Sequence, residues 1–336
     1  MNTLTKGAVL NMEQIKDNLY AIKIPLPNSP LRATTTYFIK GQPGQRHLLI
    51  DTAFNADSCE EVLMKAFAEL EVSLADTDIF ITHMHVDHCG LISRLKVPSN
   101  TIYASEVDKY WIDGFNEADY WQWQRMNNRW AGTPEALSLE NHEHVAYTYR
   151  PNKKVPLQTV TPETELSYGG YLLKVIDLAG HTPGQVGLWE EEQSFMFSAD
   201  HVLNRVSPNI AFWDQEHDYL GAYLSNLAKV KKLPVKKLYS AHFQELDDHG
   251  RRIDELIAHH EERLAEIVSL VGASSEAVTA FEIAEKMPWL GGKKVTEIAP
   301  QQRWFACTEV LAHLHHLATT GKLKVRQEAD TYKFSI

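Results

Sequence analysis

Short apolar runs separated by polar turns open the chain and predict a β-meander over residues 18–55. The runs have strand length, and a Gly-Gln-Pro-Gly turn at 41–44 divides the last two. A longer apolar and polar alternation then predicts a helix over 58–70. The strands expected in the meander span 19–24, 35–39 and 48–50.

Four later strand-like runs share one property, because each is followed at once by histidine or aspartate. A strand over 78–82 is followed by a second helix beginning near residue 90, and 101–104 predicts another strand. Polar side chains gathered at strand ends are typical of rigid metal sites. The four runs and the residues that follow them are 78–82 with His83, His85, Asp87 and His88; 171–178 with His181; 194–198 with Asp200; and 237–241 with His242.

The segment from His83 to His88 is the densest of these clusters, with four metal-binding side chains in six residues. Imidazoles and a carboxylate crowded this closely repel once charged, and burying them costs free energy. A bound cation removes both problems. The pattern therefore predicts a metal centre.

The His83-x-His85-x-Asp87-His88 motif, followed in order by His181, Asp200 and His242, resembles the metallo-β-lactamase superfamily. Asp51 matches the family's early aspartate. The resemblance covers residues from about 18 to 265 and implies a four-layer αββα sandwich in the α/β class. The segment from Asp200 to Ile210 resembles the glyoxalase II-like and lactamase-like branch. Two departures stand out. Ala53 replaces the glycine that usually follows the early Asp-Thr, and Ala241 and Phe243 replace the glycines that usually flank the last histidine.

The resemblance also implies the site chemistry. His83, His85 and His181 would hold one divalent ion, and Asp87, His88 and His242 a second, with Asp200 bridging. Zinc is the expected metal, with iron and manganese as alternatives, because imidazole and carboxylate suit all three. A hydroxide shared by two metals would attack the substrate, and Asp87, the expected catalytic residue, would orient it. Asn209 and the region of Tyr219 could reach the pocket or only pack the loop.

Beyond the strand pattern, the sequence predicts two additions to this scaffold. An aromatic segment at 106–150 predicts a helical insertion, with Trp123, Met126 and Trp130 at helical spacing. This insertion either only packs on the catalytic domain or also covers the metal face and lines a pocket. Residues 273–336 predict helix, helix and hairpin, resembling a winged-helix unit after a catalytic domain of residues 1–272. We expect this unit to serve packing or a homodimer. Histidines in two helices are expected at a helix surface or a domain contact: His259, His260, His313, His315 and His316.

Composition narrows the function classes. The formal net charge of −11, and eight basic against seven acidic residues from Ser275 onward, do not favour nucleic acid as the partner. Three widely spaced cysteines form no disulfide pattern, and the N-terminal residues contain no long apolar run. We therefore expect a cytoplasmic protein without a membrane span, and we expect Cys89 to be a small buried residue.

A metal-dependent hydrolase acting on a small ester, thioester or lactone fits these observations best. The first alternative is a nuclease of the same fold, which the winged-helix-like tail favours and the net charge opposes. The second is a mono-iron sulfur dioxygenase, which would use the first metal site alone and which the complete second set of ligands disfavours. A flavodiiron oxidoreductase is disfavoured by His85, where those proteins carry an acidic ligand.

Overall fold

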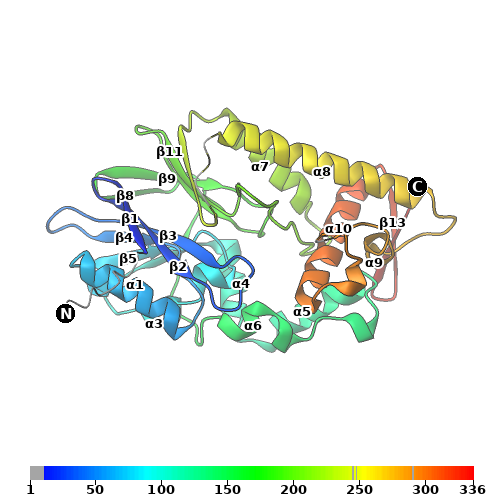
Figure 1. Ribbon diagram of the computed structural model, residues 1–336, viewed down its shortest axis with the longest axis horizontal. Helices are drawn as coiled ribbons and strands as arrows, with labels where there is room; N and C mark the ends of the chain where they lie inside the picture. The colour runs from blue at the N-terminus through cyan, green and yellow to red at the C-terminus, as the bar shows by residue number, and fades with distance from the viewer. Residues whose placement is uncertain (1–10, 244–245, 247, 290) are drawn as a thin grey trace, which may run out of the picture.

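The protein is described by a computed structural model that covers residues 11–243, 246, 248–289 and 291–336. In this part of the chain two β-sheets pack face to face, and helices cover both outer faces (Figure 1). The expected αββα sandwich is confirmed. Residues 244, 245 and 247, close to His242, lie outside the description.

The first sheet contains seven described strands in sequence order. Its first four strands are antiparallel, and its last four run parallel to one another. The meander and the strand that precedes His83 are thus confirmed, within one or two residues at each end. The strands are β1 (Met12–Lys16), β2 (Leu19–Pro25), β3 (Ala33–Ile39), β4 (His47–Ile50), β5 (Thr77–Phe80), β6 (Ile102–Ser105) and β7 (Gln158–Val160).

The second sheet has the order β12-β11-β10-β9-β8 among the described residues. Strand β11 is antiparallel to β10 and parallel to β12, and β9 is antiparallel to β10. Consequently β9, β11 and β12, which precede His181, Asp200 and His242, all point the same way. The strands are β8 (Glu165–Tyr168), β9 (Tyr171–Asp177), β10 (Val186–Glu190), β11 (Phe195–Ala199) and β12 (Lys237–Ser240).

One apolar layer lies between the sheets and a second lies under the helices. Inward side chains of both sheets, such as Leu48 and Phe80 against Leu173 and Phe197, form the inner layer. Helix α1 (Asp57–Glu69) covers the first sheet, with Leu63 and other apolar residues facing it. Helices α7 (Tyr219–Lys232) and α8 (His249–Gly272) cover the second (Figure 1). The rigid sandwich fixes the strand ends that carry the candidate ligands.

The helix expected from residue 90 onward is instead two short helices, α2 (Val86–Cys89) and α3 (Ile92–Leu95). Gly90 lies between them, and a Cβ there would approach backbone atoms of Val86, Ala53 and Asn55 within 2.7 Å. A glycine is therefore required where the metal-bearing loop passes the loop after β4.

The aromatic segment is helical, as expected. It contains α4 (Glu106–Gly114), α5 (Ala118–Trp130) and α6 (Val145–Tyr149), with single 3₁₀ turns at Glu135–Leu137 and Asn141–Glu143. Helix α5 carries Trp123 and Trp130 as the spacing predicts. Another 3₁₀ turn, Leu74–Asp76, precedes β5.

The C-terminal residues form α9 (Ala280–Ala284), a 3₁₀ turn at Val295–Glu297, α10 (Pro300–Thr319) and a hairpin of β13 (Lys324–Glu328) and β14 (Thr331–Ser335). The sequence predicts these two helices over 277–287 and 307–319, so α9 is shorter than predicted and α10 begins seven residues earlier. Helix α10 packs against α5, α7 and α8 (Figure 1). The predicted boundary between the catalytic domain and the C-terminal unit coincides with the end of α8 at Gly272. This division into domains remains a prediction. Among the described residues, no helix combines the length and apolarity that crossing a bilayer requires.

Candidate metal centre

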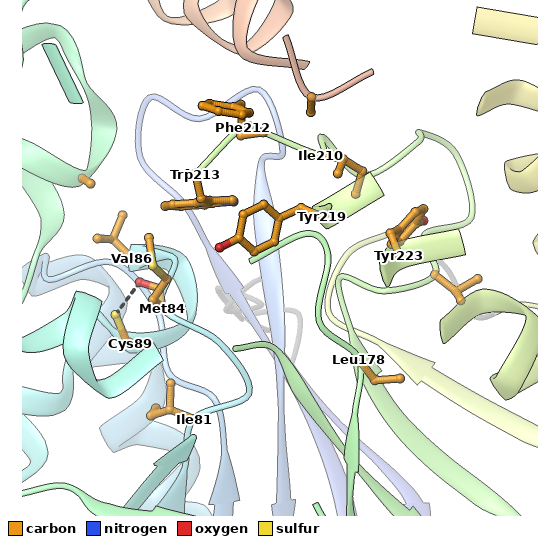
Figure 2. Packing of buried hydrophobic residues seen from close by; sticks show 14 of the residues in the cluster. Ile81, Met84, Val86, Cys89, Leu178, Ile210, Phe212, Trp213, Tyr219 and Tyr223 are labelled. Carbon is orange, nitrogen blue, oxygen red and sulfur yellow. Dashed lines mark hydrogen bonds between the residues drawn. The ribbon is translucent and has the colours of Figure 1, made fainter. Parts of the chain in front are cut away.

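The loop after β5 alternates candidate ligands with apolar anchors. Met84 and Val86 are buried in the hydrophobic core, while the neighbouring His83, His85 and Asp87 point away from it. Cys89 is also buried, and its thiol donates to the Met84 carbonyl at 3.1 Å (Figure 2). The expectation of a small buried residue there is confirmed. The anchors hold the loop so that its polar side chains converge.

The structure brings all seven predicted ligands together. They form three overlapping groups, within each of which the candidate ligand atoms lie within 4.8 Å of one another. Asp200 faces both ends, because its Oδ2 lies 3.7 Å from His181 Nε2 and its Oδ1 lies 3.6 Å from His88 Nε2. That is the placement a bridging carboxylate needs. The three groups are His83, His85 and His181; His83, His88 and Asp200; and Asp87, His88 and His242.

Four of the five histidines have their Nδ1 atom engaged away from the centre. His181 donates to the Asn209 carbonyl at 2.8 Å, and His242 donates to the Ala33 carbonyl at 2.9 Å. His83 meets the Thr82 hydroxyl at 3.1 Å, and His88 meets Asp51 at 2.8 Å. An imidazole that donates from Nδ1 presents a lone pair at Nε2, which is the metal-binding form.

The ring and carboxylate atoms that face the centre show whether a cation fits there. In the described chain the buried Nε2 atoms of His83, His88 and His181 and the Oδ1 of Asp200 have no hydrogen-bond partner. Unpaired buried polar atoms cost about 1–3 kcal/mol each. The buried Nε2 of His242 is likewise without a hydrogen-bond partner. Five such atoms in overlapping groups fit a site for divalent ions, so the residues present are able to bind metal.

Asp51 supports this centre from behind. Its carboxylate accepts hydrogen bonds from the Thr82 amide at 2.8 Å, from the Thr82 hydroxyl at 2.7 Å and from His88. Since the Thr82 hydroxyl donates to Asp51, it accepts from His83. The Asp51 carboxylate therefore orients the His88 ring directly and the His83 ring through Thr82. Asp51 itself is not one of the candidate ligands.

Burial and nearby charges shift the pKa values of the histidines in opposite directions. Burial lowers the pKa of His83 well below its ordinary value and that of His85 to about 3. Burial also opposes charge on His88 and His242. The carboxylates of Asp87 and Asp200 outweigh it and raise both pKa values, and Asp51 adds to the effect on His88. The rings near the carboxylates thus hold protons that a cation would displace.

Backbone strain is concentrated at the same edge. Asp51, Ala199 and Phe243 have φ values of 60°, 45° and 69°, in the left-handed region that favours glycine. Each lies at a strand end or directly beside a ligand. Phe243 stands where the family usually has glycine, so this chain accepts strain there, as functional sites often do.

Asp108 on α4 is a residue of the site region that the sequence analysis missed. Its buried carboxylate accepts from the Met84 amide at 2.9 Å, the Thr182 hydroxyl at 2.7 Å and the Gly184 amide at 2.7 Å. It therefore ties the loop of His83 to the loop of His181. Burial raises the pKa of Asp108 to about 6. A lone aspartate in an amphipathic helix gives no signal for this role.

We expect Asp108→Ala to lower the free energy of unfolding by about 3 kcal/mol or more, because three donors lose their shared acceptor in a buried place. Urea denaturation measures it. Asp113→Ala is the matched control, since Asp113 lies on the same helix in a partly exposed pair with Lys109. It should change stability by about 1 kcal/mol or less. Equal effects of the two substitutions would refute the tethering role.

Aromatic residues gather above the metal-bearing loop. Trp213 lies near Met84 and Val86, with Tyr219 on its other side (Figure 2). Trp123 of α5 stacks on Trp213 with ring centroids 4.8 Å apart. The indole of Trp123 also donates to the Trp213 carbonyl at 2.9 Å. The insertion and the loop between β11 and α7 therefore form one aromatic cluster, which also contains Trp111.

The helix histidines lie away from the candidate ligands. His260 and His313 are fully buried where α8 meets α10, so for this pair the prediction of a domain contact describes the position and that of a helix surface is wrong. Ser207 lies 3.4 Å from His260 Nε2, His260 Nδ1 lies 3.1 Å from His313 Nε2, and His313 Nδ1 donates to the Glu309 carbonyl at 2.8 Å. This chain of contacts requires each imidazole to donate from one nitrogen and accept at the other, which only a neutral ring can do.

This pair predicts a loss of stability in acid. Burial lowers the pKa of His313 to about 4, whereas the unfolded chain binds that proton near pH 6.5. The stabilisation is therefore complete above pH 6.5 and is lost as the pH falls toward 4. At pH 5 the loss due to His313 is about 2 kcal/mol. Denaturation at pH 7.5 and pH 5 measures the free energy of unfolding. Between these two pH values it should fall less in the His260→Gln/His313→Gln double variant than in the wild type. An equal fall in both proteins would contradict the assignment.

With this geometry in view, comparison with known proteins decides the family. A sequence profile of the metallo-beta-lactamase superfamily matches residues 29–242. The chain belongs to this superfamily. A second profile, the metallo-beta-lactamase-like C-terminal domain, matches residues 264–336. Members of the superfamily are generally hydrolytic enzymes.

Named relatives agree with this assignment. The beta-lactamase-like protein 2 homolog of Caenorhabditis elegans is 24% identical over 276 residues, which are 77% of this chain and 73% of that protein. The lactamase-like protein adaB of Aspergillus niger is 22% identical over 256 residues, 74% of this chain and 62% of the fungal protein. The chain thus spans less than two thirds of the fungal relative.

Solved structures resemble the whole described fold. A metallo-beta-lactamase family protein from Thermus thermophilus superposes with a TM-score of 0.77 at 25% identity, covering 96% of this chain and 99% of that chain. A beta-lactamase domain protein from Burkholderia ambifaria gives a TM-score of 0.76 at 19% identity, covering 97% and 94%. The shared architecture therefore includes the C-terminal elements.

Proposed function

We propose that this protein is a dinuclear metal-dependent hydrolase of a small ester, thioester or lactone. The observation that carries the proposal is the gathering of inward Nε2 and carboxylate atoms in three overlapping groups, with Asp200 close to both His181 and His88. His83, His85 and His181 would hold one ion, and Asp87, His88 and His242 the other. Zinc suits these ligands, as do iron and manganese.

Two bound divalent ions would supply an activated water near neutral pH and a Lewis acid for the substrate oxygen. The chain's own residues do the positioning. Asp87 is the carboxylate that would take or return a proton, because His88 lowers its pKa to about 2 against the effect of burial and keeps it ionised. Its Oδ2 lies 3.2 Å from His242 Nε2.

The aromatic cluster supports a small substrate with an apolar part. Trp111 and Trp123 are only partly buried, and they pack beside Trp213 close to the metal-bearing loop. Such a wall can hold an acyl or aryl group while the polar end faces the metal ligands. We propose that the insertion at 106–150 covers the metal face in this way.

We expect Trp123→Ala to change the ratio of kcat/KM between long and short acyl substrates by about tenfold or more, because an apolar wall selects by chain length. Trp121→Ala is the control: Trp121 is buried inside the insertion and donates to the Phe115 carbonyl at 3.0 Å. It should lower stability and change all substrates alike. If both variants change every substrate equally, the selective role of Trp123 is wrong.

Packing of the C-terminal unit argues against the nuclease alternative. Helix α10, which would read DNA in a winged-helix unit, is packed against α5, α7 and α8. Its buried residues include Arg303, which donates to the Leu137 carbonyl at 2.9 Å. A helix occupied in this manner has little free surface for a groove, and we propose a packing role for residues 273–336.

A substrate panel tests the proposal. The metal-loaded protein is assayed with thioesters, lactones, aryl esters, phosphodiesters and single-stranded RNA. We expect turnover of at least one carbonyl substrate and none of RNA. Activity on RNA with none on any carbonyl substrate would replace this proposal with the nuclease alternative.

A further inference from the structure

The loop between β11 and α7 supplies a support for one candidate ligand. The Asn209 carbonyl accepts the Nδ1 proton of His181 at 2.8 Å, which turns His181 Nε2 toward Asp200. Asn209 lies in a stretch without helix or strand. A carbonyl in such a loop can orient a ring only if something else holds the loop.

Helix α10 holds it at two points. The Asn209 side-chain amide donates to Glu309 Oε2 at 2.8 Å and to the Phe305 carbonyl at 3.2 Å. Three residues along the loop, the Phe212 amide donates to the Thr308 carbonyl at 3.2 Å. Figure 2 shows the neighbouring Ile210 and Phe212 above the metal-bearing loop. The loop is thus fastened to the C-terminal unit rather than to the sandwich alone.

The helix itself is fixed against the catalytic domain. The Glu309 carbonyl accepts from His313, whose other ring nitrogen meets His260 of α8. Burial raises the pKa of the Glu309 carboxyl to about 7. Burying a carboxyl costs free energy unless it is hydrogen-bonded, and the Asn209 side-chain amide supplies that bond.

We propose that Glu309 is a positioning residue that orients His181 through Asn209, so that the C-terminal unit sets the metal affinity of the first site. This inference rests on the proposed metal-dependent function and adds a role for the C-terminal unit, residues 273–336, which lies within the second profile match at 264–336. Its consequence is selective: loss of Glu309 weakens the site of His181 and leaves the site of His242 unchanged.

The test is a Co²⁺ titration of the full chain against a competing chelator, followed by visible absorption. A His242→Ala background isolates the first site, and a His85→Ala background isolates the second. In the first background we expect Glu309→Ala to weaken Co²⁺ binding by about 10- to 100-fold and to alter the absorption spectrum. In the second it should change binding less than about threefold. Glu309→Gln keeps an acceptor for Asn209 and should restore most of the affinity.

Thr308→Val is the matched control on the same helix. The Thr308 hydroxyl bonds within α10, and its carbonyl, which accepts from Phe212, is retained. It should leave both affinities unchanged. Unchanged first-site affinity in Glu309→Ala, or equal weakening of both sites, would overturn the inference while wild-type binding upholds the proposed function. A wild-type chain that binds no Co²⁺ would instead refute the proposed function, and the inference with it.

Discussion

Asp87→Ala is expected to lower kcat by about 10³-fold in metal-saturated enzyme, since the side chain would both hold the second ion and manage the proton in the transition state. The fold should survive. Removing Asp87 loses its attraction to His88, but the loop that carries it remains anchored in the core by Met84 and Val86. Steady-state kinetics on the substrate found in the panel measures the change.

The control for Asp87 is Asp254→Ala, which removes a surface carboxylate paired with Lys231. It should leave kcat unchanged, and both variants should keep a melting temperature within a few degrees of wild type. Near-normal kcat in Asp87→Ala would refute the catalytic role.

Metal removal is expected to abolish hydrolysis and to destabilise the fold. With no cation, the inward nitrogens of His83, His88 and His181 are buried without partners. Metal at 1,000 times its Kd stabilises the native state by about 4 kcal/mol, so chelation should lower Tm by roughly 5–10 °C. Calorimetry before and after chelation measures this shift. Readdition of Zn²⁺ should restore both properties, and activity that survives complete chelation would contradict the account.

The sequence predicted the parts of this fold that are encoded locally. The candidate ligands stand directly after short apolar strands, which indicated a metal site. These strands lie in two different sheets, so the resemblance to the superfamily, rather than strand geometry alone, implied that the ligands converge. Strand β10 was missed because Gly187 interrupts its apolar run. The structure shows why glycine is there: a Cβ would lie 2.7 Å from the Phe197 carbonyl and from Leu178.

The supports of the site depend on contacts between distant residues, which a single sequence does not reveal. Asp108 lies 76 residues before Gly184, one of its donors, and Asn209 lies 100 before Glu309. The pairing of His260 with His313 is likewise invisible in either helix alone. Local pattern therefore indicated which residues could bind metal, whereas the groups that orient them required the packed chain.

Metal stoichiometry tests the central claim most directly. Elemental analysis of untagged protein is made after dialysis against excess Zn²⁺, for wild type, His85→Ala and His242→Ala. Two ions per wild-type chain and one in each variant are expected, because each substitution removes a ligand from a different group. A wild-type stoichiometry that stays at one with excess metal would contradict the dinuclear account.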